Sequence, residues 1–211
     1  MKQIVFLLIA LLYISNYGYS QLPTKDSISA INSILEFQKE LKEQYADTAE
    51  SPLPDEAVGS FKGHEFFDID LKYRVQADLV LTLDSPIFEM PTTTSRKPKY
   101  RQYAIAVFTI DNVEYRLALY QSQSLMENEE YKDYLFIPFK DYTNGVETYG
   151  GGRYIDLRIP EGDKIIIDFN QAYNPYCAYS VRYSCPIPPD QNHLPVEIRA
   201  GIKYKDDYHD K

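Results

Sequence analysis

The sequence predicts a mainly β protein, an antiparallel β-sandwich or partly closed barrel with one amphipathic α-helix at its N-terminal end. Helical spacing of apolar residues is confined to residues 26–45, whereas from about residue 61 apolar and polar residues alternate with a period of two. Turn signals such as Asp111-Asn112 and Glu161-Gly162-Asp163 separate the alternating runs. Strands and helices do not alternate along the chain, which favours an antiparallel sheet.

The helix is expected to begin at an N-cap supplied by Asp26 or Ser27 and to end near Tyr45. Pro52 and Pro54 follow, and proline restricts the residue before it to extended backbone, which ends a helix. Its apolar residues share one stripe, so we expect it to pack on its own domain. The stripe contains Ile28, Ile31, Ile34, Leu35, Leu41 and Tyr45.

The clearest β element is a hairpin in which strands 103–110 and 113–120 flank Asp111-Asn112. A two-residue loop favours a type I′ turn here, because aspartate and asparagine tolerate positive φ. The expected register places six apolar residues on one face. It pairs Ile110 with Val113, Phe108 with Tyr115, and Ala106 with Leu117.

Further strands are expected over residues 134–139, 154–159, 165–169 and 194–203, with turn signals between the strands. An earlier run alternates Leu79, Leu81 and Leu83 with Asp78, Val80 and Thr82. Residues 121–133 are polar and are interpreted as a loop.

The first 20 residues have the three parts of a cleavable secretory signal peptide. A cationic start at Lys2 precedes an apolar run over residues 4–12, and small residues Gly18 and Ser20 stand before Gln21. The alternative, an uncleaved anchor, needs about 20 apolar residues to span a bilayer. We therefore expect an exported protein, periplasmic or secreted, with no transmembrane span after cleavage.

The chain after the signal peptide divides into three parts by composition. Residues 21–60 hold the helix and a proline-containing linker, 61–205 form a single β-rich domain, and 206–211 are a charged tail. The formal net charge of −9 repels phosphate backbones, so nucleic acid is not an expected partner. The sequence indicates neither a cofactor nor an oligomeric state.

Glycine and ionisable residues are concentrated between residues 134 and 201. Gly150 to Gly152 immediately precede Arg153, whose guanidinium could hold a carboxylate of the protein or of a ligand in a bidentate pair. We expect a site for a small polar molecule where residues 150–153 meet residues 168–174. The candidate ligand-binding residues are Arg153, Tyr149, Tyr154, Asn170, Tyr173 and Asn174.

Two carboxylates that face a cleft could perform general acid–base chemistry, as in hydrolases. Glu147 and Asp168 are the candidate catalytic residues, with Asp141 as a third. In one alternative, Arg153 and these acids form a buried ion-pair network that fixes loops. The remaining alternatives are a non-catalytic ligand-binding domain, for which tyrosine-rich surfaces are suited, and a structural envelope protein.

Cys177 and Cys185 are the only cysteines, and in an exported chain such a pair is typical of a disulfide. A short loop closed in this way contributes roughly 2–3 kcal/mol. Two alternatives stay open: buried thiols, and a metal site that includes His193. The metal alternative lacks the close Cys-x-x-Cys spacing of strong zinc motifs.

Residues 134–201, which we call the dense segment, resemble an uncharacterised bacterial and archaeal family of domains of unknown function, number 1684. The dense segment contains blocks similar to FxDxTxGxETYxxGRY, DFNxAYNPxCAY and CPxPPxxN, and earlier fragments such as Ser51-Pro52-Leu53 and Phe61-Lys62-Gly63 also match. The resemblance covers nearly all of the chain after the signal peptide and implies no activity. It also implies that both cysteines are kept in relatives that are cytosolic. His64 departs from the family pattern, which more often has an apolar residue there.

Overall fold

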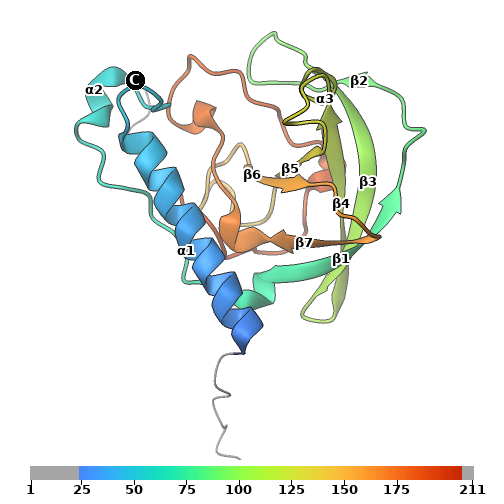
Figure 1. Ribbon diagram of the computed structural model, residues 1–211. Coiled ribbons are helices and arrows are strands. Elements are labelled where there is room, and N and C mark those ends of the chain that lie inside the picture. The colour runs from blue at the N-terminus through green and yellow to red at the C-terminus, as the bar shows by residue number, and fades with distance from the viewer. Residues whose placement is uncertain (1–23, 206–211) are drawn as a thin grey trace, which may run out of the picture.

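The computed structural model describes residues 24–205. The predicted signal peptide and the charged tail with His209 lie outside the described residues. The chain folds into a mainly antiparallel sheet that curls into a half-barrel, which confirms the predicted fold class. Helix α1, Lys25–Ala46, runs along one side of the molecule, and β3 and β4 lie on the opposite side (Figure 1). Within residues 24–205, no helix is both long and apolar enough to cross a membrane.

The sheet has seven strands in the order β6-β5-β4-β3-β1-β7, with β2 paired to β3. The predicted strands at 134–139, 154–159 and 165–169 are confirmed to within one residue. The bounds are β1 Arg74–Leu81, β2 Phe88–Glu89, β3 Lys99–Ile110, β4 Val113–Ser122, β5 Tyr134–Phe139, β6 Arg153–Arg158 and β7 Lys164–Asp168. Two short helices, α2 Asp55–Val58 and α3 Gln123–Met126, complete the elements that Figure 1 labels.

The predicted hairpin is confirmed in its turn and in its register. Asp111 and Asn112 have φ values of 49° and 63°, as a type I′ turn requires. Ile110 pairs with Val113, and the pairing continues through Phe108↔Tyr115 and Ala106↔Leu117. Turn chemistry and side-chain alternation therefore agree over the whole hairpin.

The N-cap of α1 is Thr24, so the prediction of Asp26 or Ser27 was wrong. The Thr24 hydroxyl accepts a hydrogen bond from the backbone N–H of Ser27 at 3.1 Å, and Ser27 is therefore inside the first turn. Ile34 and Tyr45 are buried, whereas Ile28 and Leu35 are half exposed. The buried stripe of α1 is narrower than the sequence predicts.

Residues 194–203 do not form the strand that their alternation predicts. They make only isolated bridges, Lys140↔His193 beside them and Phe66↔Ile202 within them. The apolar side chains at Ile198 and Ala200 are buried in the core, which explains the alternation. The carbonyls of Ile198 and Ala200 accept hydrogen bonds from Arg153 instead of from a neighbouring strand.

The two faces of the sheet are covered by different parts of the chain. The inner face of the half-barrel packs Leu117, Leu135 and Ile155 against the segment that contains Ile198. On the opposite face of β4, β5 and β6, a second cluster rich in tyrosines includes Cys177 and Cys185. In β1 the alternation extends past the core, because Leu79 packs against it but Leu81 is exposed.

Candidate functional site

Arg153, at the start of β6, is completely buried. Its Nη2 donates to Asp141 Oδ2 at 2.7 Å and to the carbonyl of Ile198 at 2.9 Å, and its Nη1 donates to the carbonyl of Ala200. Asp141 in turn accepts hydrogen bonds from the N–H and the hydroxyl of Thr143, at 2.8 and 2.6 Å. We call these residues the Arg153 cluster.

The Arg153 cluster is a structural network. Burial lowers the pKa of Arg153, and the neighbouring Asp141 carboxylate opposes this shift. Breaking such a buried pair leaves an uncompensated charge, so each partner holds the other in place. Because both side chains of the pair are without solvent exposure, the structure favours the ion-pair alternative for Arg153 and Asp141 over ligand binding or catalysis.

Asp168 lies at the end of β7 and also binds neighbouring parts of the chain. Its carboxylate accepts hydrogen bonds from Arg74 Nη1 at 3.2 Å and from the N–H of Asn170 at 3.0 Å. The Asn170 side chain bonds the backbone N–H and carbonyl of Asp70, at 3.1 and 3.0 Å. Asp168 and Asn170 thereby fix the corner between β7 and the start of β1.

The other candidates of the dense segment are separated from this corner. Glu147 accepts a hydrogen bond from Arg199 Nε at 3.0 Å, so Glu147 and Asp168 belong to different ion pairs. Buried Asn174 donates to the hydroxyl of Tyr179 at 2.8 Å and joins the loops near the C-terminal segment. The structure thus distributes the predicted catalytic carboxylates over three separate clusters.

A cavity of about 210 Å³ lies on the outer, tyrosine-rich face of β6. Three parts of the chain that are far apart in the sequence meet around it, at residues 93, 140–154 and 175–187. We call it the tyrosine–cysteine pocket; it is lined by Thr93, Lys140, Tyr149, Gly151, Tyr154, Pro175, Cys177, Pro186 and Ile187.

Two of the three consecutive glycines are required beside this pocket. A Cβ at Gly151 would lie 2.3 Å from the Tyr149 ring, so a side chain there would displace that ring. Gly152 has φ of 96°, and a Cβ there would lie 2.6 Å from the carbonyl oxygen of Phe139. The glycine run therefore shapes a wall of the pocket and lets the chain enter β6.

Tyrosines hold the pocket wall together. Tyr154 is buried, and its hydroxyl donates to the carbonyl of Pro186. Tyr173 packs edge-on against Tyr154 with ring centroids 5.9 Å apart, and their backbones are hydrogen-bonded to each other. Burial raises the pKa of Tyr149 to about 12, so its hydroxyl is a neutral donor at neutral pH.

Cys177 and Cys185 are buried neighbours with free thiols. The N–H of Cys177 donates to Cys185 Sγ at 3.1 Å, and only Cys177 of the two lines the pocket. A hydrogen bond from Cys185, aided by Tyr149 and Thr93, lowers the pKa of Cys177 to about 7, although burial opposes this. The hydrogen bond to Cys177, followed by burial, raises the pKa of Cys185.

The predicted disulfide is not formed in the structure. Cys177 and Cys185 are instead two buried thiols, as in one of the alternatives. The sulfurs are held together by hydrogen bonds in place of a covalent bond. The oxidised form of the pair stays a prediction. As for a metal site, no group of three or more potential ligands is found anywhere in residues 24–205.

Sequence reasoning missed Asp156 as a partner of the tyrosines. The hydroxyls of Tyr134 and Tyr173 donate to its two carboxylate oxygens, at 2.6 and 2.8 Å. Asp156 keeps an exposed surface, yet the rings around it withdraw water and raise its pKa. The signal was its spacing: in a strand, residue 156 shares a face with Tyr154, opposite Arg153.

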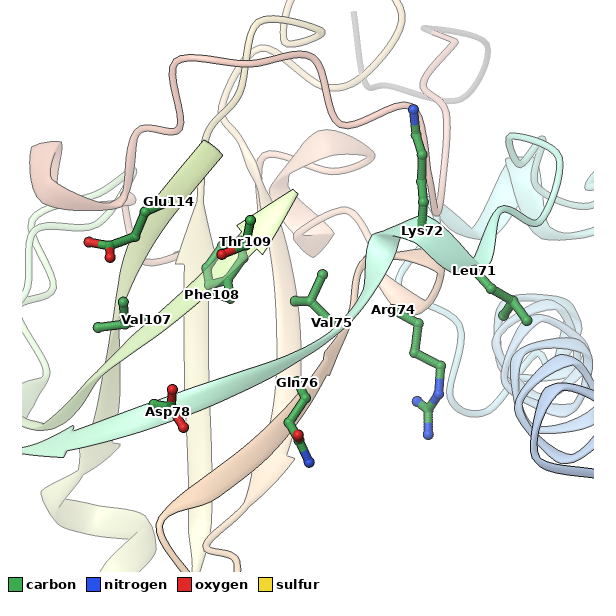
Figure 2. A pocket seen from close by; sticks show the side chains of 10 residues that line it. All are labelled: Leu71, Lys72, Arg74, Val75, Gln76, Asp78, Val107, Phe108, Thr109 and Glu114. Atoms are coloured by element: carbon green, nitrogen blue, oxygen red, sulfur yellow. The ribbon is translucent and has the colours of Figure 1, made fainter. Parts of the chain in front are cut away.

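A second cavity, of about 460 Å³, is a groove between β1 and β3. The two strands are paired at Asp78↔Val107 and separate beyond this pair. Figure 2 shows that Lys72 and Arg74 at one end of the groove point in different directions. Lys72 pairs with Asp111 at 3.6 Å, and Arg74 with Asp168. The charges that line the groove therefore do not converge, and none of the predicted site residues lines it.

The fold and the pocket define a class of small half-barrel proteins with a helix on one side and a tyrosine-lined cavity on the outer sheet face. Within that class, the chain belongs to the family described as Protein of unknown function (DUF1684), whose model matches residues 59–203. The resemblance of the sequence blocks is thereby confirmed at the level of the family.

Solved structures similar to the chain include one that matches over most of its length. It is the solution NMR structure of an uncharacterised protein from Haloarcula marismortui, which is 31% identical, with a TM-score of 0.65. The match covers 85% of this chain and 96% of that protein. No curated protein matches the chain.

Proposed function

We propose that the protein is an exported binding protein that holds a small polar molecule in the tyrosine–cysteine pocket. The observation that carries the proposal is the convergence of Tyr149, Gly151 and Tyr154 with the segment of Cys177 around one cavity. Pockets for drug-sized ligands have volumes of about 300–1,000 Å³, so a cavity of about 210 Å³ suits a smaller molecule.

The lining indicates the chemistry of the ligand. Tyrosine rings offer flat apolar surface, and their hydroxyls offer polar contacts at the edge of a ligand. Lys140 adds a cation to the lining, which favours a molecule that carries a carboxylate or another anionic group. A small carboxylic acid with an apolar body fits these properties best.

Binding is favoured over hydrolysis because the carboxylates near the site already have partners. Asp141 is bonded to Arg153, and both oxygens of Asp156 accept hydrogen bonds from tyrosines. A general acid or base must reach the substrate, and a carboxylate occupied in this way does not. The hydrolase-like alternative therefore lacks an available acid–base pair next to the pocket.

The test is an NMR titration of the protein with a library of small carboxylic acids. A binding compound should shift the amide signals of residues 149–154, 175–177 and 186–187. Gly151→Ala should weaken its binding by at least about tenfold, which is about 1.4 kcal/mol, because the added Cβ displaces Tyr149.

Gly162→Ala is the matched control, since a Cβ there meets nothing within 4 Å. Equal affinity in Gly151→Ala and wild type, or shifts only in other parts of the molecule, would contradict the proposal. Export is tested separately by cell fractionation and N-terminal sequencing. We expect a mature N-terminus at Gln21, and a cytoplasmic protein that retains residues 1–20 would contradict export.

A further inference from the structure

We propose that Cys177 and Cys185 form a thiol–disulfide exchange centre in which Cys177 attacks a low-molecular-weight disulfide and Cys185 resolves the mixed disulfide. The proposal rests on the proposed function only in that the same pocket gives access to Cys177. It goes beyond a structural disulfide, because it assigns different roles to the two sulfurs and requires the bond to form reversibly.

The geometry separates the two roles. Cys177 is a lining residue of the tyrosine–cysteine pocket, which gives a small molecule a route to it, whereas Cys185 is not part of the lining. Cys185 lies directly behind it, with its Sγ 3.1 Å from the backbone nitrogen of Cys177. An attacking thiol with access and a resolving thiol next to it are the two parts that exchange requires.

Cys185 is held by hydrogen bonds with Thr93, and Cys177 is held by its place in a helical turn. The N–H of Cys185 donates to the Thr93 hydroxyl at 3.1 Å, and its carbonyl accepts from the N–H of Thr93 at 3.0 Å. Cys177 lies in a short helical turn, Tyr176–Ala178, that follows Pro175. The two sulfurs are thus brought together by fixed backbone.

The environment of Cys177 favours its thiolate, which is the reactive form. Hydrogen bonds from Cys185, Tyr149 and Thr93 lower the pKa of Cys177 to about 7. Two adjacent sulfurs do not both ionise easily, and the hydrogen bond with Cys177, followed by burial, raises the pKa of Cys185. At neutral pH a large fraction of Cys177 is therefore thiolate while Cys185 keeps its proton.

The reaction proceeds in two balanced steps. The Cys177 thiolate attacks one sulfur of a disulfide RSSR; the bond between the two R–S sulfurs breaks, and RS⁻ leaves. Cys185 then gives its proton to a thiolate in solution and attacks Cys177 Sγ, which expels the second RS⁻. The second RS⁻ takes up from water the proton that Cys177 released when it ionised. In total, one RSSR is reduced to two RSH, and the two protein thiols are oxidised to one disulfide.

The test uses the full chain after reduction, with oxidised glutathione as the probe and alkylation followed by mass spectrometry as the readout. Cys185→Ser should trap a stable mixed disulfide between Cys177 and one glutathione. Cys177→Ser should react at least about tenfold more slowly at pH 7. The wild type should form the Cys177–Cys185 disulfide and return to two thiols in reduced glutathione.

A measurement on the wild type alone covers the case in which a variant does not fold. With a limiting amount of iodoacetamide, peptide mapping should find Cys177 alkylated at least about tenfold more than Cys185.

Three results would overturn the proposal: equal reactivity of the two cysteines, no mixed disulfide in Cys185→Ser, or a wild-type disulfide that glutathione cannot reduce. None of these results depends on carboxylic acid binding. The exchange centre and the proposed ligand site can therefore fail separately.

Discussion

Arg153 is the centre of the Arg153 cluster, and the next residue, Tyr154, lines the tyrosine–cysteine pocket, so the two regions meet at consecutive residues but lie on opposite faces of the sheet. Arg153 and Tyr154 are the first two residues of β6, and successive side chains of a strand point to opposite faces. Arg153 points into the half-barrel, where it is completely buried and holds the C-terminal segment. Tyr154 points to the outer face and lines a cavity.

The difference shows that a concentration of charge in a sequence does not by itself indicate a site. On the inner face, Arg153 is paired with Asp141 and hydrogen-bonded to backbone carbonyls. On the outer face, the chemistry comes from tyrosine hydroxyls and a thiol next to a cavity. The predictions below test this division, from the largest expected effect to the smallest.

Arg153→Ala should destabilise the protein most, because it leaves Asp141 buried without its partner. We expect a loss of about 3–5 kcal/mol, which lowers the melting temperature by roughly 6–20 °C for a chain of this size. Arg199→Ala is the control: its ion pair with Glu147 is exposed and contributes at most about 1 kcal/mol. Equal melting temperatures in the two variants would contradict a structural role for Arg153.

His64 lies outside both regions and should make the stability of the protein depend on pH. Burial against aromatic rings, with Tyr45 centred 4.3 Å away, lowers the pKa of His64 to about 4. The unfolded chain binds a proton near pH 6.5 and the folded chain does so only near pH 4. The contribution of His64 to stability is therefore present above pH 6.5 and is lost as pH falls towards 4.

His64→Phe should remove this dependence. Urea unfolding at pH 7 and pH 4.5 should show a loss of about 2 kcal/mol in wild type beyond that of the variant. If both proteins lose the same stability, then His64 does not stay neutral in the folded state.

Gly152→Ala, compared with Gly151→Ala, should separate the effect of the glycine run on stability from its effect on the pocket. A Cβ at this position of positive φ meets backbone, so we expect a loss of about 1–3 kcal/mol in chemical unfolding. Gly151→Ala meets only the side chain of Tyr149 and should cost less stability while it closes the pocket. The opposite order of stabilities would contradict the assignment of the two glycines.

Tyr149→Phe should change reactivity with little change in stability. The alkylation rate of Cys177 in wild type should rise with pH to half its maximum near pH 7, because the thiolate forms there. Loss of the Tyr149 hydroxyl removes a donor to the sulfur and should move this midpoint to higher pH. An unchanged midpoint would show that Tyr149 does not stabilise the thiolate.

The sequence predicts best those features that depend on neighbouring residues. The hairpin could be predicted with its register, because Asp111-Asn112 determines the turn and the flanking alternation determines the faces. Residues 194–203 show the limit of this reasoning. Their alternation reflects burial, but the carbonyls of Ile198 and Ala200 accept hydrogen bonds from Arg153, which lies 45 residues before Ile198 in the chain, and no local pattern shows this.

The candidate site could be located only in part for the same reason. The glycine run with Tyr149 and Tyr154 was predicted as a site, and Tyr149, Gly151 and Tyr154 do line a cavity. Cys177 was considered as half of a disulfide, as a buried thiol or as a metal ligand, but not as a pocket residue, because its place beside the cavity depends on how Thr93, Tyr149 and Pro186 converge in space. The same non-local packing placed Arg153 inside the half-barrel and away from the pocket.

The most direct test of this division is the NMR titration with small carboxylic acids, read residue by residue. We predict shifts confined to Thr93, Lys140 and residues 149–154, 175–177 and 186–187, with the signals of Thr143 and of residues 198–202 unchanged. Shifts centred on the Arg153 cluster or on the groove between β1 and β3 would contradict the account. In that case the ligand site would lie on the face that is assigned here to structure alone, or in the groove.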